Sequence, residues 1–213
     1  MTEPTTSEPA AAPEIERVVF FSDAVVAIAM TLLVLPLLES VSESGRSTLA
    51  AWLDEHGPQL VAFVVSFGVS AVFWLSHHRL FQHLKRYDRL VLLLSVVWLL
   101  PMVLLQVPTA MVYAYPMDRP LIACYIGTML LASLLLSILT HHAWRHPELC
   151  DTPMQGSAVR ASWIQSGIFV LVLLLALLVP SIGYLWLFLL VLIGPVNALV
   201  RRITSRHPAA DPT

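Results

Sequence analysis

One aspartate stands inside an otherwise apolar stretch of the sequence. Asp23 lies in the run 18–38 and is the one acid clearly inside such a run. An ionisable side chain at the centre of a membrane-spanning helix costs about 2.5–3.5 kcal/mol on insertion scales and therefore marks a site. Two kinds of chemistry fit this residue: it binds a cation or carries a proton directly, or its carboxylate is a buried hydrogen-bonding hub that fixes helix packing. The sequence leaves both readings open.

Partners for Asp23 have to come from another helix. Arg17 precedes it by six residues, which is about 120° around a helix at 100° per residue, so the two are not an i,i+4 pair. The next apolar run crosses in the opposite direction, and its last residues therefore share the depth of Asp23. Three of these have ring nitrogens: Trp74, His77 and His78. We expect His77 or His78 to contact Asp23.

The same helix carries an aliphatic stripe. Ile28, Leu32 and Leu35 lie within about 60° of one another around the helix axis, and Thr31 flanks them. Asp23 lies about 140° from this stripe. Every apolar helix has such stripes, so the spacing alone does not separate a face that lines a pore from one that packs against lipid or a neighbour.

Six apolar runs have to position these residues. A hydrocarbon core of about 30 Å requires about 20 residues of helix. The runs are 18–38, 59–77, 90–113, 120–141, 160–180 and 182–200. Pro180, Ser181 and Gly183 separate the last two. The sequence therefore predicts an all-α membrane protein with six transmembrane helices.

The distribution of Lys and Arg predicts the orientation of these helices. With alternating crossings, ten of the 12 basic residues fall on one side, and only Arg46 and Arg119 fall on the other. The side richer in Lys and Arg faces the cytoplasm, so we expect both termini there. Residues 1–16 and 207–213 are rich in Pro, Ala and polar residues and are expected to be disordered cytoplasmic tails. Residues 17–206 would form the six-helix transmembrane domain.

Composition excludes several classes of protein. Of the 213 residues, 57% are hydrophobic and 12% are charged, about half the charge of a soluble domain, and mean hydropathy is +0.77. The net charge of −2 provides no positive field that would attract nucleic acid. The two cysteines, Cys124 and Cys150, are far apart, and no metal-ligand, nucleotide or cofactor motif is visible. We therefore expect no cofactor.

A short motif opens the first apolar run. Its residues 17–23 read R-x-x-x-F-S-D, and an uninterrupted apolar helix follows. Together with a six-span chain of about 200 residues and both ends inside, this pattern resembles the transmembrane protein 175 family of potassium channels. The resemblance covers the whole architecture, and it is specific in the first helix.

The resemblance implies an assembly and a constriction. Prokaryotic members look like homotetramers in which the first helix of each subunit lines a central pore. They lack the TVGYG carbonyl filter of ordinary potassium channels, and so does this sequence. In the family, bulky aliphatic side chains form the constriction, which the resemblance places at Ile28. Leu32 and Leu35 would follow further outward on the same face, with Thr31 as a pore-facing threonine.

The resemblance also implies a polar network at the cytoplasmic end of the pore helix, with Arg17, Ser22 and Asp23 as members. From their depth we add two residues of the second helix to this group. The expected motif residues and partners are therefore Arg17, Phe21, Ser22, Asp23, Trp74 and His77.

These observations predict a potassium-permeable cation channel of the cell membrane. In a bacterium this would be the plasma membrane. It would be a lipid-embedded homotetramer with potassium ions as its cargo, no nucleic-acid partner and no enzymatic activity. The alternative is a proton-coupled transporter of ions or small solutes that uses Asp23 and His77 as a relay. A third possibility, a membrane enzyme, would need its polar residues to converge at the depth of Asp23.

Overall fold

The computed structural model describes residues 12–43, 45, 48–116 and 118–179, and these residues form an all-α protein. The helices are α1 (Ala12–Leu32), α2 (Leu35–Glu43), α3 (Leu49–Phe81), α4 (Arg89–Leu104), α5 (Gln106–Ala114), α6 (Arg119–Arg145) and α7 (Gly156–Leu178). A 3-10 turn, Pro147–Leu149, lies between the last two.

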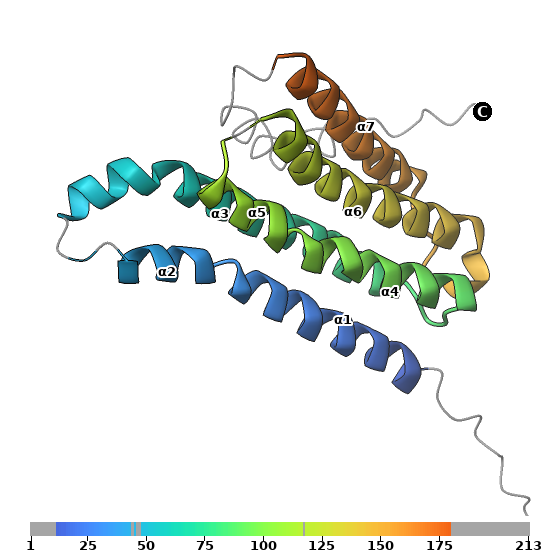
Figure 1. Cartoon of the computed structure of the whole chain (residues 1–213). Coiled ribbons are helices and arrows are strands. Elements are labelled where there is room, and N and C mark those ends of the chain that lie inside the picture. Colours follow the sequence, from blue (N-terminus) through green and yellow to red (C-terminus); the bar gives the residue numbers. More distant parts are fainter. Residues whose placement is uncertain (1–11, 44, 46–47, 117, 180–213) are drawn as a thin grey trace, which may run out of the picture.

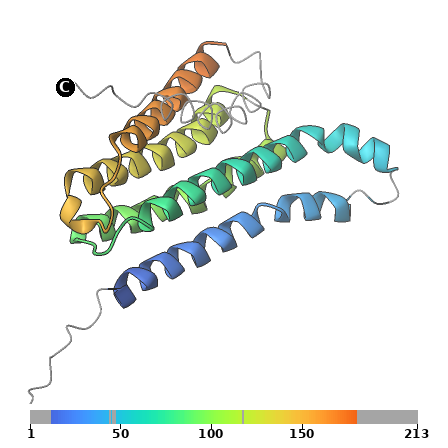
Figure 2. The same ribbon diagram turned by 180° about the vertical axis from the view of Figure 1, so that it is seen from behind.

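The helices lie side by side in an elongated bundle. In Figure 1, α1 and α2 follow one another along one edge, and α7 lies along the opposite edge. Between these edges lie α3, the continuous pair α4 and α5, and α6, and the view from behind gives the same order (Figure 2). The order leaves α1 with neighbours on one side only.

Five stretches are long and apolar enough to cross a membrane, so the chain is a multi-pass membrane protein. They are Ile15–Glu43, Leu49–Phe81, Arg89–Ala114, Arg119–Arg145 and Gly156–Leu178. The first five predicted spans are thereby confirmed in existence and order. The sixth predicted span, 182–200, and the tail 207–213 lie outside the described residues.

Prolines interrupt two of the spans that the sequence analysis treated as continuous. Pro36 has no N–H to donate to the carbonyl of Leu32, and α1 ends there. Pro108 has the same effect on the carbonyl of Leu104, at the boundary between α4 and α5. In both places the second helix continues the direction of the first (Figure 1).

Two helices, α1 and α3, begin at least six residues before their predicted positions. Residues 12–16, expected to belong to the N-terminal tail, are the first turn of α1. Ile15 in this turn is buried, so packing extends the helix beyond the apolar run. The third helix begins at Leu49, ten residues before the predicted position, because the Thr48 hydroxyl accepts a hydrogen bond from the N–H of Ala51 and caps the helix.

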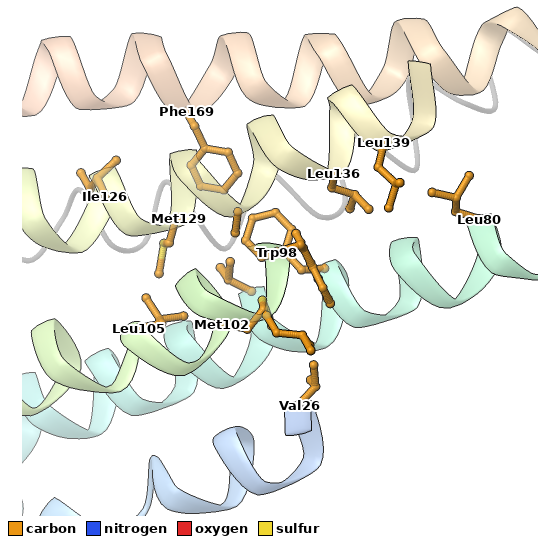
Figure 3. Packing of buried hydrophobic residues seen from close by; sticks show 14 of the residues in the cluster. Val26, Leu80, Trp98, Met102, Leu105, Ile126, Met129, Leu136, Leu139 and Phe169 are labelled. Carbon is orange, nitrogen blue, oxygen red and sulfur yellow. The ribbon is translucent and has the colours of Figure 1, made fainter. Parts of the chain in front are cut away.

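The hydrophobic core is centred on α6, with α3 as the next largest contributor and further residues from α4 and α7. Trp98 is fully buried and lies between Met102 on its own helix and Phe169 on α7 (Figure 3). Val26 reaches the same cluster from α1, at its edge. Large buried side chains in contact provide the dispersion energy that holds helices together in lipid, where no hydrophobic driving force between helices exists.

Hydroxyl groups join the helices within this apolar bundle. Ser66 on α3 forms hydrogen bonds with Thr109 on α5 and Tyr125 on α6. Ser166 on α7 forms hydrogen bonds of 2.8 and 2.9 Å with Ser133 and Ser137 on α6. These bonds satisfy polar groups that the hydrocarbon cannot solvate and contribute about 0.6 kcal/mol each in comparable bundles.

One end of the bundle gathers the basic residues, and we call it the basic end. The start of α1, α4 and α7 and the last turns of α3 and α6 meet there (Figure 1). The described basic residues at this end are Arg17, Arg79, Lys85, Arg86, Arg89, Arg145 and Arg160. The α3–α4 and α6–α7 connections lie at this end and are joined by backbone hydrogen bonds. Among these are Lys85 N–H to Leu149 O (2.9 Å) and Asp151 N–H to His83 O (2.8 Å).

Asp88 organises this end. Its carboxylate accepts the N–H of Val91 at 2.7 Å, which caps α4, and the other oxygen lies 2.8 Å from Nε2 of His142 on α6. Burial raises the pKa of Asp88, but these hydrogen bonds outweigh it and hold the pKa below its usual value. The carboxylate therefore stabilises the fold above the usual carboxyl pKa, and this contribution is lost as the pH falls through the lowered value.

We expect Asp88→Ala to destabilise the protein by about 1 kcal/mol, because the cap of α4 is lost. Asp118→Ala is the matched control, since Asp118 caps α6 through the N–H of Leu121 at 3.1 Å. Thermal unfolding of the purified protein should show a larger loss for Asp88→Ala, which also frees His142. The difference from wild type should shrink below about pH 4, as the carboxylate is protonated. If the stability difference between wild type and Asp88→Ala stayed the same in acid, the charge of the Asp88 carboxylate would have no role in it.

Candidate functional site

The first helix packs against the rest of the chain along one face. Ser22, Val26, Ala29 and Leu33 are buried, and their spacing of three or four residues places them on a single stripe. This stripe faces α3 and α4, the two long helices in contact with α1. The packed face therefore fixes which side chains of α1 point away from the bundle.

The aliphatic stripe predicted from the sequence lies on the opposite, outward face. Ile28 is 60% and Leu32 39% exposed on α1, and Leu35, which the sequence placed on the same helix, is the first residue of α2 and 46% exposed. Thr31 is exposed beside them, and its hydroxyl donates to the backbone carbonyl of Ile28 at 2.8 Å. All four side chains are more than one-third exposed within the described chain. They form a continuous apolar surface with one hydroxyl along the outer edge of the bundle.

Asp23 lies at the border between the two faces and is half-buried. The indole Nε1–H of Trp74 on α3 donates a hydrogen bond of 2.8 Å to its carboxylate. Trp74 in turn stacks on His78, with ring centroids 5.5 Å apart. The expected hydrogen-bond partner, His77 or His78, is therefore wrong: the residue of α3 that faces Asp23 is Trp74.

His77 belongs to the core instead. It is buried and stacks on Trp98 with ring centroids 4.4 Å apart and planes at 8°, and its ring also lies 4.5 Å from that of Phe81. Its Nε2 has no hydrogen-bond partner among the described residues. His77 follows Trp74 by three positions, a turn of about 60° around the helix, and its imidazole lies against Trp98 of α4 instead of facing α1.

The remaining motif residues line a shallow groove. Arg17, Phe21 and Ser22, together with residues of the α3–α4 connection and α4, enclose about 310 Å³. Arg17 and Phe21 are exposed, whereas Ser22 is buried and its hydroxyl has no hydrogen-bond partner in the part of the chain that the structure describes. The network implied by the family resemblance is thus reduced, within one chain, to the bond between Asp23 and Trp74.

Among the described residues, the site contains no cluster of side chains that could hold a metal ion, because no three His, Cys, Asp or Glu side chains lie close enough together. A single carboxylate held by an indole, beside an uncovered aliphatic face, can instead position a helix whose other side meets a further partner.

Sequence reasoning missed the hydroxyl contacts that hold the scaffold behind α1. Ser133 and Ser137, and likewise Ser162 and Ser166, are spaced by four residues within apolar runs. That spacing puts each pair on one helix face. Small polar residues repeated at this interval are typical of helix contacts in membranes, so the signal was present.

Comparison with known proteins agrees with this architecture. A family model described as "Endosomal/lysosomal potassium channel TMEM175" matches residues 17–105. A potassium channel from Streptomyces collinus is 33% identical over 153 residues, which is 70% of this chain and 74% of that protein. The bovine endosomal/lysosomal proton channel TMEM175 is 41% identical over 78 residues, but the match covers only 33% of this chain and 16% of that protein.

A solved structure extends the likeness to the fold. The crystal structure of a lysosomal potassium-selective channel TMEM175 homolog from Chamaesiphon minutus superposes with a TM-score of 0.69 at 25% identity. The superposition covers 87% of this chain and 98% of that one. The identity to the Streptomyces protein, the coverage of both chains and the shared fold all point the same way: this chain belongs to the TMEM175 family.

Proposed function

We propose that this chain is a potassium-permeable cation channel whose constriction is a ring of aliphatic side chains on α1, in place of a carbonyl filter. Four copies would surround a central pore, and Ile28 of each copy would form the narrowest level. The basic end of the bundle would face the cytoplasm, as its excess of Lys and Arg favours. Relatives named as potassium channels support the cargo.

One observation carries this proposal: the stripe of Ile28, Leu32 and Leu35 faces away from α3 and α4, opposite the buried residues of the first span. Thr31 lies on the same face, and its hydroxyl is satisfied within the helix by the carbonyl of Ile28. A face that one chain leaves open can meet its own copies around a symmetry axis. Each copy would contribute the same stripe to the pore.

The physics of such a ring suits potassium. Apolar side chains do not replace the water around an ion, so the ring favours the cation that sheds its water more easily. A narrow apolar ring also closes by dewetting without any movement of charge. Potassium is less strongly hydrated than sodium, and we therefore expect a modest preference for it.

A proton relay through Asp23 and His77 is disfavoured by the contacts described above. The indole N–H of Trp74 occupies the carboxylate of Asp23, and an indole is a donor only, with no site that accepts a proton. His77 stacks against Trp98 rather than facing Asp23. The hub interpretation of Asp23 fits these contacts better than the carrier interpretation.

The first prediction concerns assembly. If α1 lines a shared axis, the purified protein in mild detergent should have a mass of four times 23.6 kDa plus the micelle. Mass photometry or light scattering with subtraction of the detergent measures this directly. A monomer that still conducts ions in a planar bilayer would refute the shared pore.

The second prediction concerns the constriction. Ile28→Asn keeps most of the side-chain volume but adds an amide that water and cations can contact, so the ring should no longer dewet. Unitary current in planar bilayers should rise several-fold, and the preference for potassium over sodium should fall toward one. Leu171→Asn on α7 is the control, because that leucine is 55% exposed, comparable with Ile28. Wild-type permeation in an assembled Ile28→Asn channel would exclude this residue from the constriction.

The third prediction concerns the motif. Asp23→Asn and Trp74→Phe each weaken the same bond, and the loss of a buried partner costs about 1–3 kcal/mol. Both variants should lower the melting temperature of the assembled protein while leaving the reversal potential unchanged. The double variant should lose less than the sum of the two, because the residues are coupled. An assembled Asp23→Asn channel with altered ion preference would identify Asp23 as an ion ligand.

A further inference from the structure

A cavity of about 670 Å³ opens at the basic end, away from α1 and the proposed pore. It lies between the last turns of α3, the C-terminal half of α6 and the first half of α7. Its volume is in the range of sites that hold small molecules. The proposed pore makes no use of it.

The charges on its wall have one sign. Arg79 near the end of α3 and Arg160 in the second turn of α7 line it, with His83 beside them, and no Asp or Glu is among its described lining residues. Both arginines are exposed side chains near helix ends, where the bundle meets the membrane surface. The cavity is therefore an electropositive recess, which attracts anions and repels the cations of the pore.

The N-terminus of α7 adds to this field. Gln155 precedes the helix without forming a side-chain cap, and both Gln155 and Ser157 line the cavity. The first backbone N–H groups of a long helix carry a partial positive charge and bind anions where no side chain caps them.

An independent feature lies deeper in the same cavity. Gln165 is more than nine-tenths buried, yet it lines the cavity, so the remaining accessible part of its side chain faces into it. The structure gives its amide no hydrogen bond to any described residue. Its amide is not among the fully enclosed, unpaired polar groups, so it keeps access to the cavity, where its N–H₂ group provides two donors for a ligand. Thr140 on α6 borders the same space.

We propose that this cavity binds a phosphate-bearing anion. Arg79 and Arg160 pair with the phosphate oxygens at the mouth, assisted by the N-terminus of α7, and the Gln165 amide donates to a polar part of the ligand further in. Two sources supply this chemistry: the headgroup of an anionic phospholipid from the adjoining leaflet, or a soluble phosphate compound. Basic pockets between transmembrane helices at the cytoplasmic surface hold such headgroups.

The test uses the full-length protein in phosphatidylcholine nanodiscs. Inorganic phosphate is titrated against sodium chloride of equal ionic strength in one arm, and phosphatidylglycerol is included in the disc in the other. Thermal unfolding is followed in both arms. A soluble ligand predicts stabilisation by phosphate in phosphatidylcholine alone. A lipid ligand predicts stabilisation by phosphatidylglycerol, with no further gain from phosphate.

Variants decide whether the cavity is responsible. The double variant Arg79→Gln, Arg160→Gln should weaken the response of the effective probe about tenfold or more in apparent dissociation constant, and Gln165→Leu should weaken it less. Arg145→Gln is the matched control, because Arg145 is exposed at the same end of the bundle but does not line the cavity. If the double variant does not fold, Arg160→Gln alone carries the comparison.

Three outcomes would overturn the proposal: neither probe stabilises the wild type, the arginine variants respond as the wild type does, or Arg145→Gln loses the response equally. The last result would assign the effect to the general charge of the surface. Because no arm measures ion current, failure of this site leaves the proposed pore intact.

Discussion

The hydrogen bond between Trp74 and Asp23 sets the rotation of the first helix, and the outward face follows from that rotation. An apolar helix in lipid has little to fix its angle about its own axis, since leucine packs about as well against lipid as against leucine. A carboxylate in this environment has to find a donor. Once Asp23 meets the indole of Trp74, Val26 and Leu33 point inward and Ile28 points outward.

The five described membrane spans could be predicted from hydropathy, because hydrocarbon imposes a minimum length on any apolar span. The outward stripe followed from helix periodicity, which gives the relative angles of Ile28, Leu32 and Leu35. Periodicity does not say which stripe faces the neighbours, and that had to come from the family resemblance or from the packed structure. Ile28 lies on an exposed face, as the family resemblance implied.

The partner of Asp23 could not be predicted by depth alone. Trp74 and His77 occupy nearly the same depth on α3 and differ by only about 60° around its axis, so the packing angle between α1 and α3 decides which of them faces Asp23. The breaks at Pro36 and Pro108 were readable in principle, because proline removes a backbone donor. The cavity at the basic end depends on how three separate helices diverge, for which the sequence has no local signal.

The length of α3 has a consequence for the membrane around the protein. Its 33 residues extend about 50 Å, well beyond a hydrocarbon layer of about 30 Å. Glu55 and Arg79 bound its apolar part, about 36 Å apart along the axis, and neither charge can enter the acyl chains cheaply. The helix is thereby held at one height. In a thinner bilayer the helix therefore tilts or the lipids around it stretch, at a cost of a fraction of a kcal/mol per Å of mismatch.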